Sequence, residues 1–181
     1  MNTQVEYRSD YITDNHQDKG VDVYVYGQRS ESNLAGLRHA IVIVARKALT
    51  LTEVDYFVND GMRTQAEQTY AYEHHASQTL GGPHLYGIAI DVLAWVNGRI
   101  NWGVPPDDAY YHKIARAFQR ASIELRIPVI WGGVWDIRLS MLGTNLADEM
   151  RAYKRRNGGH AFFDIGHFQL PNSDRIVYQE I

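Results

Sequence analysis

The sequence contains no cysteine. This absence excludes a disulfide framework and thiolate metal ligands, so any metal ion must be held by histidine and carboxylate side chains. Long apolar runs are also missing, because the longest, residues 40–45, is far too short to cross a bilayer. Residues 1–19 are polar and include no apolar stretch of the kind found in signal peptides. We therefore expect a protein made in a cytoplasm without a classical export signal.

The sequence also lacks an excess of positive charge. The formal net charge is −3, so neither nucleic-acid binding nor attachment to an anionic membrane is expected as the main role. With 45% apolar and 22% charged residues over 181 positions, the composition is that of a soluble globular protein with one domain. We expect residues 1–28 to form a polar surface arm and residues 29–181 to form the domain. Residues 21–26 alternate loosely and could instead add a short edge strand.

Periodicity and turn signals predict a mixture of helices and strands. The first half is expected to contain a helix over residues 32–48 with Ser32 or Asn33 as its N-cap, a strand at 54–58 followed by a turn at 59–61, a helix from Thr64 to about His75 and a strand at 88–93. The second half is expected to contain a helix capped by Asp107 and ending near Leu125, a strand at 129–131, one or two helices in an insertion at 136–162, and a last strand at 168–170.

Local signals support two of these elements. Thr64 and Glu67 have the spacing of a capping box, and Asn97-Gly98 predicts a two-residue hairpin turn. We expect an α+β fold, in which a small, mostly antiparallel sheet has helices packed on one side and a metal site on its open face.

Two short segments carry the residues that suggest chemistry. In residues 81–91, His84 follows a Gly-Gly-Pro loop, and Asp91 lies in the next strand on the face opposite the apolar residues. Downstream, Asp164 and His167 border another short strand. Adjacent strands could bring these four side chains together, and they would suffice for a zinc site of His/Asp/His type with one carboxylate left over. A spare carboxylate can accept a proton from a zinc-activated water.

Each spacing alone is weak evidence, because eight histidines produce such patterns by chance. The other histidines are weaker candidates, since neighbouring residues on a helix point in different directions and a histidine on an amphipathic helix packs or faces solvent. They are His16, His39, His74, His75, His112 and His160. Arg63 lies between a strand end and a helix start, so it is either an ordinary surface arginine or a functional side chain just before the metal segment.

Four motifs occur in a specific order: Gly-x-Arg-Thr-x-x-x-Gln at 61–68, His-x6-Asp at 84–91, Trp-Gly-Gly-x-Trp at 131–135 and Asp-x-x-His-Phe-Gln-Leu at 164–170. In this order they resemble the zinc peptidases that act on peptidoglycan stem peptides. That group includes the D-Ala-D-Ala carboxypeptidases and dipeptidases, and the L-alanyl-D-glutamate endopeptidases used as phage endolysins. The similarity runs from about residue 29 to residue 170, and the chain looks most like the single-domain phage endolysins.

The resemblance implies a role for each reactive side chain. One zinc ion would be bound by His84, Asp91 and His167. Asp164 would be the general base that deprotonates the water and later passes the proton to the leaving amine. Arg63 would bind the scissile carbonyl oxygen and stabilise its developing negative charge.

Substrate contacts are expected from Gln68, Trp131 and Trp135, although two tryptophans beside a Gly-Gly turn could equally be core residues. Gly82 stands where the family usually has a serine, a change expected to loosen metal or substrate positioning. The insertion at 136–162 is expected to reshape the substrate groove or act as a lid. Near the end of the insertion lies a basic cluster. Its positive charges either stabilise the C-terminus of a helix or contact an anionic bacterial surface. The cluster consists of Arg151, Lys154, Arg155 and Arg156.

The function that the resemblance implies is a zinc-dependent phage endolysin that cleaves the L-Ala–D-Glu bond of stem peptides. A D-Ala-D-Ala carboxypeptidase is the alternative among enzymes. The alternative that is not an enzyme is a non-catalytic zinc-bearing cell-wall binding module on the scaffold of hedgehog-type signalling domains. The expected partner is bacterial peptidoglycan, without nucleic acid or stable membrane insertion, and a monomer is expected. The protein would be made in the host cytoplasm and would act on periplasmic or wall peptidoglycan after release.

Overall fold

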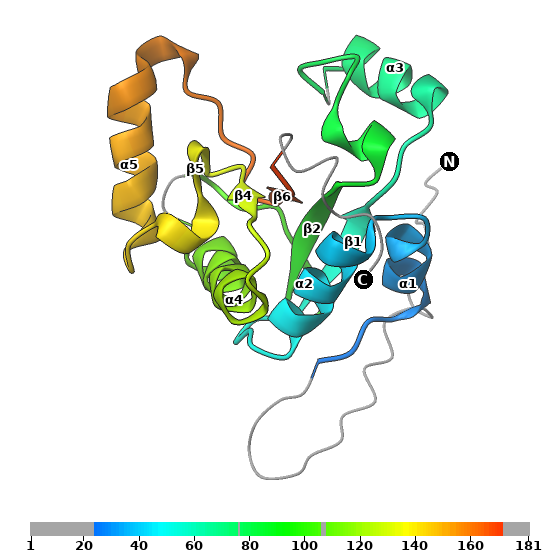
Figure 1. Ribbon diagram of the computed structural model, residues 1–181, viewed down its shortest axis with the longest axis horizontal. Coiled ribbons are helices and arrows are strands. Elements are labelled where there is room, and N and C mark those ends of the chain that lie inside the picture. The colour runs from blue at the N-terminus through cyan, green and yellow to red at the C-terminus, as the bar shows by residue number, and fades with distance from the viewer. Residues whose placement is uncertain (1–23, 76, 106–107, 172–181) are drawn as a thin grey trace, which may run out of the picture.

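The centre of the fold is a sheet whose neighbouring strands come from distant parts of the chain (Figure 1). The computed structural model describes residues 24–75, 77–105 and 108–171. Within them the strands run in the order β1-β2-β6-β4-β5, β3 pairs with β2, and every pair is antiparallel. The strands are β1 (Tyr56–Asp60), β2 (Ala89–Val96), β3 (Arg99–Asn101), β4 (Ile130–Trp131), β5 (Val134–Arg138) and β6 (His167–Gln169). The predicted α+β class is confirmed.

The side chains of strand β2 alternate between an apolar face of the sheet and a polar face. Ile90 and Val92 are fully buried, and Asp91 between them points to the opposite face, as the two-residue period predicts. The chain then reverses at Asn97-Gly98, whose φ angles of 52° and 75° are those of the predicted two-residue hairpin turn. Strand β3 pairs with the end of β2.

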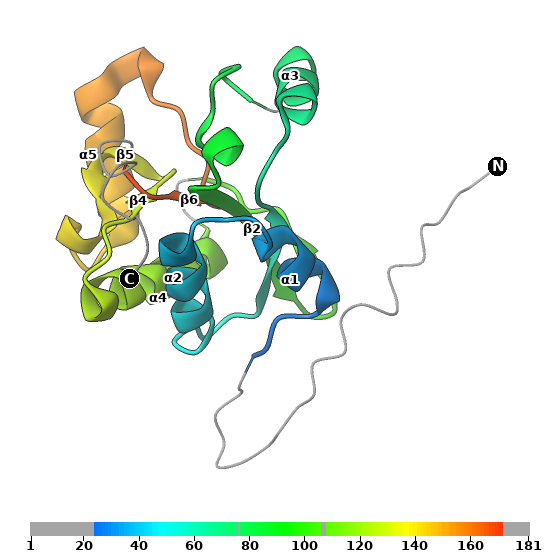
Figure 2. The same cartoon turned by 45° about the vertical axis from the view of Figure 1, so that its right-hand side comes forward.

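Two helices, α2 (His39–Leu49) and α4 (Ala109–Leu125), lie side by side and pack on the apolar face (Figures 1 and 2). Phe118 of α4 stacks on Phe168 of β6 with ring centroids 3.9 Å apart, and both rings are fully buried. The N-cap of α4 is Asp108, whose carboxylate accepts two backbone N–H groups of the first turn. The predicted cap, Asp107, is therefore wrong by one position and lies outside the described residues.

The prediction of one continuous helix over residues 32–48 is wrong, because two helices share that stretch. Helix α1 (Gln28–Leu34) ends just before Gly36, whose φ of +78° is a left-handed conformation that terminates helices. The turn is fixed by a distant contact, since the Arg38 N–H donates to the Gly87 carbonyl at 2.8 Å. Arg38 is the N-cap of α2. Both predicted N-caps instead lie inside α1; they are Ser32 and Asn33.

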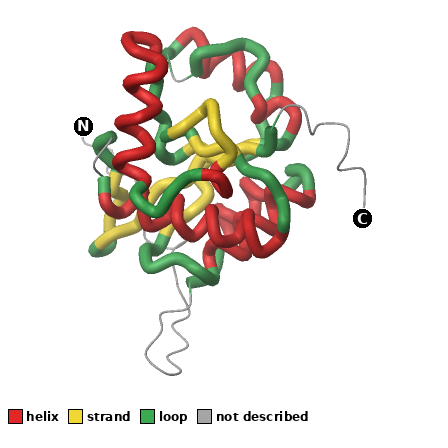
Figure 3. The backbone as a smooth tube through the Cα atoms, turned by 60° about the vertical axis from the view of Figure 1, so that its left-hand side comes forward, coloured by secondary structure: helices red, strands yellow, loops and turns green. Residues whose placement is uncertain are grey.

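The polar face of the sheet has helices at its two sides. Helix α3 (Gln65–Glu73), which starts at the predicted capping box, and α5 (Leu146–Asn157) stand apart, and Figure 3 shows the strands gathered between helical segments. Three short 3-10 turns complete the fold: η1 (Pro83–Tyr86), η2 (Leu139–Met141) and η3 (Gly158–His160).

Three other segments differ from the expectation. Strand β1 begins at Tyr56, two residues late, and takes in part of the predicted turn. Residues 24–26 form no strand, and 21–23 lie outside the described residues. The segment 136–162 is helical only in part, because its first residues belong to β5, which pairs with β4. Within the basic cluster, Arg156 forms an ion pair with Asp136 at 2.9 Å, which is a structural role.

Candidate metal centre and cleft

His84 enters the site from η1, just after the Gly-Gly-Pro loop. Its imidazole is almost fully buried. The ring Nδ1 lies 2.6 Å from the Gly61 carbonyl oxygen, so Nδ1 carries the proton and donates it. This hydrogen bond leaves Nε2 as the lone-pair nitrogen, and Nε2 lies 3.3 Å from Asp91 Oδ2.

Asp91 and His167 meet because β2 and β6 are paired in register at these two residues. His167 Nδ1 lies 2.8 Å from Asp91 Oδ1. The other ring nitrogen, Nε2, lies 3.0 Å from Gln169 Oε1. Residues two apart on a strand share a face, so β6 itself places Gln169 where it can orient the imidazole.

The three side chains fit a divalent cation. His84, Asp91 and His167 each offer one ligand atom, and these atoms lie within 4.8 Å of one another. Each imidazole has an oxygen acceptor on its outer nitrogen, which is the arrangement that orients histidine ligands toward a metal. The sequence-predicted ligands are therefore brought together as one group.

Electrostatics at this group favour a bound cation. Burial raises the pKa of the Asp91 carboxyl, but hydrogen bonds and charge from His167 and His84 lower it by more, so it lies well below its usual range. Burial lowers the pKa of His167, but the hydrogen bond and charge of Asp91 outweigh it and the net shift is upward. A metal ion would replace the proton that His167 shares with Asp91, so metal and protons compete for one position.

Asp164 lies in the same cleft, but its carboxylate, unlike that of Asp91, is not paired with another side chain of the described residues. Within the described residues, its carboxylate has no hydrogen bond or ion pair, whereas its backbone N–H donates to the Gly132 carbonyl at 2.9 Å. Gly132 N–H in turn donates to the His167 carbonyl at 2.9 Å. Burial and the negative charge of Asp91 raise the pKa of Asp164. The glycine turn therefore fixes the backbone of the segment that supplies a ligand and the spare carboxylate.

Arg63 is held by three side chains. Its Nε donates to Asp60 Oδ2 at 2.6 Å, and its Nη2 contacts both Asp60 and Asp91, the latter at 3.1 Å. Its Nη1 donates to Gln68 Oε1 at 3.3 Å. The arginine side chain is only 15% exposed, so the sequence-predicted Arg63 is part of the site and not an ordinary surface residue.

The three predicted substrate contacts have different surroundings. Gln68 is fully buried, and its Nε2 donates to Ser77 Oγ at 2.8 Å and to the Thr79 carbonyl at 2.5 Å. Trp135 lines the cleft, with its ring centroid 5.0 Å from that of His167. Trp131 is fully buried, and its indole N–H donates to the Ile165 carbonyl at 2.9 Å. The prediction that Trp131 lines the cleft is therefore wrong, and its core alternative holds.

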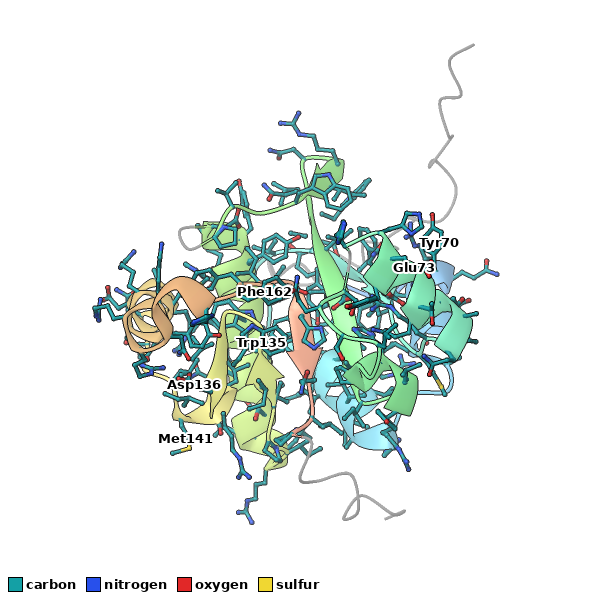
Figure 4. All side chains as sticks on the ribbon, turned by 90° about the horizontal axis from the view of Figure 1, so that it is seen from above. Tyr70, Glu73, Trp135, Asp136, Met141 and Phe162 are labelled. Carbon is teal, nitrogen blue, oxygen red and sulfur yellow. The ribbon has the colours of Figure 1, made fainter. Side chains whose placement is uncertain are left out.

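The cleft has a volume of about 440 Å³. Viewed from above (Figure 4), Trp135 and Phe162 lie near β6 on one side, and α3, marked by Tyr70 and Glu73, lies on the other. Its lining comes from both sides and from the metal group: Arg63, Gln68, Ser77, Gln78, Thr79, Gly82, Pro83, His84, Asp91, Trp135, Tyr153, Phe162, Asp164, His167 and Gln169. Five of the other histidines take no part in this group; they are His39, His74, His75, His112 and His160. His16 lies outside the described residues.

Sequence reasoning missed the residues that support the ligands. Gln169 carried a signal, because it lies two positions after His167 on the same strand. Gly61 begins the first of the four motifs, but no pattern linked Asp60 or Gly61 to the ligands, since their roles depend on an irregularity in β1 that brings Asp60 opposite Asp91. Gly82 lies against Gln68, whose Nε2 would be 3.1 Å from a Cβ built at that position.

Comparison with known proteins gives three consistent findings. A sequence profile described as phage L-alanyl-D-glutamate peptidase matches residues 23–170. The L-alanyl-D-glutamate peptidase of Escherichia phage T5 is 30% identical over 116 residues, which cover 62% of this chain and 82% of that protein. The crystal structure of the L-Ala D-Glu endopeptidase ChiX of Serratia marcescens is similar with a TM-score of 0.62 and 34% identity, over 83% of this chain and 92% of that chain.

Proposed function

Because the chain belongs to the phage L-alanyl-D-glutamate peptidase family, we propose that it cleaves its substrate with one zinc ion and with Asp164 as the proton carrier. The activity, an L-alanyl-D-glutamate peptidase of phage type, follows from the family. The observation that carries the proposal is the group of His84, Asp91 and His167, with Asp164 in the same cleft.

The donor set supports zinc. Two imidazole nitrogens and one carboxylate oxygen are typical zinc ligands, whereas calcium and magnesium prefer oxygen donors alone. A zinc ion with an open position supplies Lewis-acid activation of water and of a carbonyl group. The chain contributes the orientation of both imidazoles, through the Gly61 carbonyl and Gln169 Oε1.

Asp164 carries the proton in this proposal. Its carboxylate would accept a proton from water and then donate it to the nitrogen of the departing D-Glu residue. Its backbone is fixed by Gly132, and its carboxylate is not engaged by another described side chain. A carboxylate with both properties can move between acceptor and donor roles without breaking a structural hydrogen bond.

Arg63 would donate to the scissile carbonyl oxygen. A guanidinium has five N–H donors, and contacts to Asp60, Asp91 and Gln68 use four of them. One Nη1–H is left over, on a side chain that lines the cleft. The same contacts hold the guanidinium in one orientation, so little side-chain entropy is lost when the carbonyl binds.

Two alternatives are disfavoured. A carboxypeptidase needs a cation for the free carboxylate of its substrate, but the only Lys or Arg among the described lining residues is Arg63, already paired with Asp60 and Asp91. A non-catalytic binding module has no use for a spare carboxylate such as Asp164.

We further propose that the monomeric protein acts on bacterial peptidoglycan after release from the host cytoplasm. In the described part of the chain, no helix has the length and apolarity needed to cross a membrane.

The test combines metal analysis with product identification. Purified protein should contain one zinc ion, lose activity with a chelator and regain it with zinc. Mass spectrometry of digested peptidoglycan should show new peptides that begin with D-Glu; loss of terminal D-Ala alone would instead support the carboxypeptidase.

The role of Asp164 is tested separately. Asp164→Asn should retain zinc while kcat falls by about 10²–10⁴-fold, the usual contribution of a positioned general base. Asp148→Asn, which alters a carboxylate on α5 that is 66% exposed, is the control and should retain full activity. Unchanged turnover in Asp164→Asn would refute the proton-carrier role.

A further inference from the structure

Helix α1 covers the free edge of the sheet. Strand β1 is the terminal strand of the described sheet, and α1 lies against it (Figure 1). Exposed strand edges carry backbone groups that need partners, and α1 supplies them from its side chains. Ser30 Oγ accepts the Val58 N–H at 3.1 Å. Asn33 Nδ2 donates to the carbonyls of Val58 and Asn59, each at 2.9 Å.

These hydrogen bonds meet β1 at its irregular point. Val58 pairs with Val92 and Asp60 pairs with Asp91, so Asn59 is an extra residue in β1. Such a bulge re-aims the strand that carries it. The side chain of Asn59 is held as well, because its Oδ1 accepts from Arg29 of α1 at 2.8 Å.

The two residues after the bulge contact Arg63 and His84 directly. Asp60 is an ion-pair partner of Arg63, and the Gly61 carbonyl accepts the Nδ1 proton of His84. Gly61 also packs tightly on α1, because a Cβ at this position would lie 1.8 Å from the Asn33 carbonyl oxygen. Asn33 therefore contacts the bulge on both sides, with its amide on residues 58–59 and its backbone on Gly61.

We infer that Asn33 is a positioning residue for the metal centre, acting through the bulge on the hydrogen bond between Gly61 and His84. Without its amide, two carbonyls of the edge strand lose their donor, and residues 59–61 can shift away from the imidazole. His84 then loses the acceptor that keeps the proton on Nδ1 and the lone pair on Nε2. Outer partners of metal-binding histidines typically alter metal affinity by about 10–100-fold, so Asn33→Ala should weaken zinc binding by about tenfold. This inference rests on the metal site proposed above.

The chain offers a matched control. Gln119 in α4 is also an amide that donates to two backbone carbonyls, those of Leu139 at 2.9 Å and Leu142 at 2.7 Å. It is buried and belongs to the opposite, helix-covered side of the sheet. Gln119→Ala should therefore destabilise the fold without changing zinc affinity, whereas Asn33→Ala should change both.

Zinc affinity of the full chain would be measured by competition with a chromophoric chelator. Nitrogen NMR of the zinc-free protein would report the His84 tautomer, which a merely structural role of Asn33 would leave unchanged. We expect weaker zinc binding and a mixed His84 tautomer in Asn33→Ala, with wild-type values in Gln119→Ala. Wild-type values in Asn33→Ala, or equal losses in both variants, would overturn the inference.

A second variant covers the case in which Asn33→Ala does not fold. Asn59→Ala removes only the acceptor for Arg29 and should lower zinc affinity in the same direction by a smaller factor; an unchanged affinity would then overturn the inference. Failure of the wild-type protein to bind zinc would refute the proposed metal site itself, so the two failures are distinguishable.

Discussion

A methyl group added at Gly132 should damage the site without altering any side chain in it. A Cβ at this position would lie 2.1 Å from the Asp164 carbonyl oxygen and 3.0 Å from Trp135 Cζ2. Real Cβ atoms essentially never approach closer than 3.0 Å, so the two backbone segments must separate by about 1 Å. That movement would also strain the hydrogen bonds from Gly132 to His167 and from Asp164 to Gly132.

The substitution should slow catalysis at 25 °C without unfolding the chain. A misplacement of about 1 Å at reacting groups costs about 10²-fold in rate. Overpacking of this kind destabilises a fold by about 1–3 kcal/mol, which lowers the Tm of a chain of this size by roughly 2–12 °C. Gly132→Ala should therefore remain folded at 25 °C while kcat falls by about two orders of magnitude.

The assay compares Gly132→Ala with Gly159→Ala, because a Cβ at Gly159 would meet no atom within 4 Å. Release of peptide from purified peptidoglycan gives kcat, and calorimetry gives Tm. Gly159→Ala should match the wild type in both. A Gly132→Ala variant that lost stability but kept its kcat would show that the geometry of the Asp164–His167 turn does not limit the rate.

Three further predictions follow from single contacts. Gln169→Ala should weaken zinc binding by about 10–100-fold, because His167 loses its outer acceptor; equal affinity in a chelator competition would contradict this. Thr64→Ala should lower the free energy of unfolding by about 1 kcal/mol through loss of the α3 capping box, with zinc affinity unchanged. Burial raises the pKa of Asp55 to about 6, so the folded state disfavours its ionised form and stability falls as pH rises from about 4 to 6. Asp55→Asn should therefore gain roughly 1–2 kcal/mol at pH 7 and nothing at pH 4, and urea unfolding showing equal gains at both values would refute the assignment.

Local signals placed the reactive residues in two short segments beside predicted strands, and the resemblance of the ordered motifs implied their roles. His84 follows a proline-containing loop, and Asp91 occupies the polar face of an alternating strand, so their spacing fixes their relation. The different positions of Trp131 and Trp135 could also have been predicted. If Gly132-Gly133 is a two-residue turn, Trp131 pairs with Val134 and shares its face, so Trp135 must point to the opposite face.

Apart from Gln169, the supporting residues were not predictable, because their roles depend on distant contacts. The break between α1 and α2 coincides with the hydrogen bond from Arg38 to Gly87, and helical periodicity continues across it. The bulge at Asn59 is held by Arg29 and Asn33 from another element. A side chain such as Asn33 signals a helix cap from sequence alone, and only the packing of α1 on β1 assigns it elsewhere.

Strand β6 has a consequence for how the protein is made. It pairs with β2 on one side and with β4 on the other, so in the described sheet it alone joins the two halves. It also supplies His167, which is 76 positions after Asp91. A nascent chain still lacking β6 has an open sheet and two of the three ligands, so synthesis on the ribosome must pass Gln169 before the metal site can form. A chain that stopped between β5 and β6 would hold two unjoined parts of the sheet and an incomplete set of ligands, so it should have no peptidase activity.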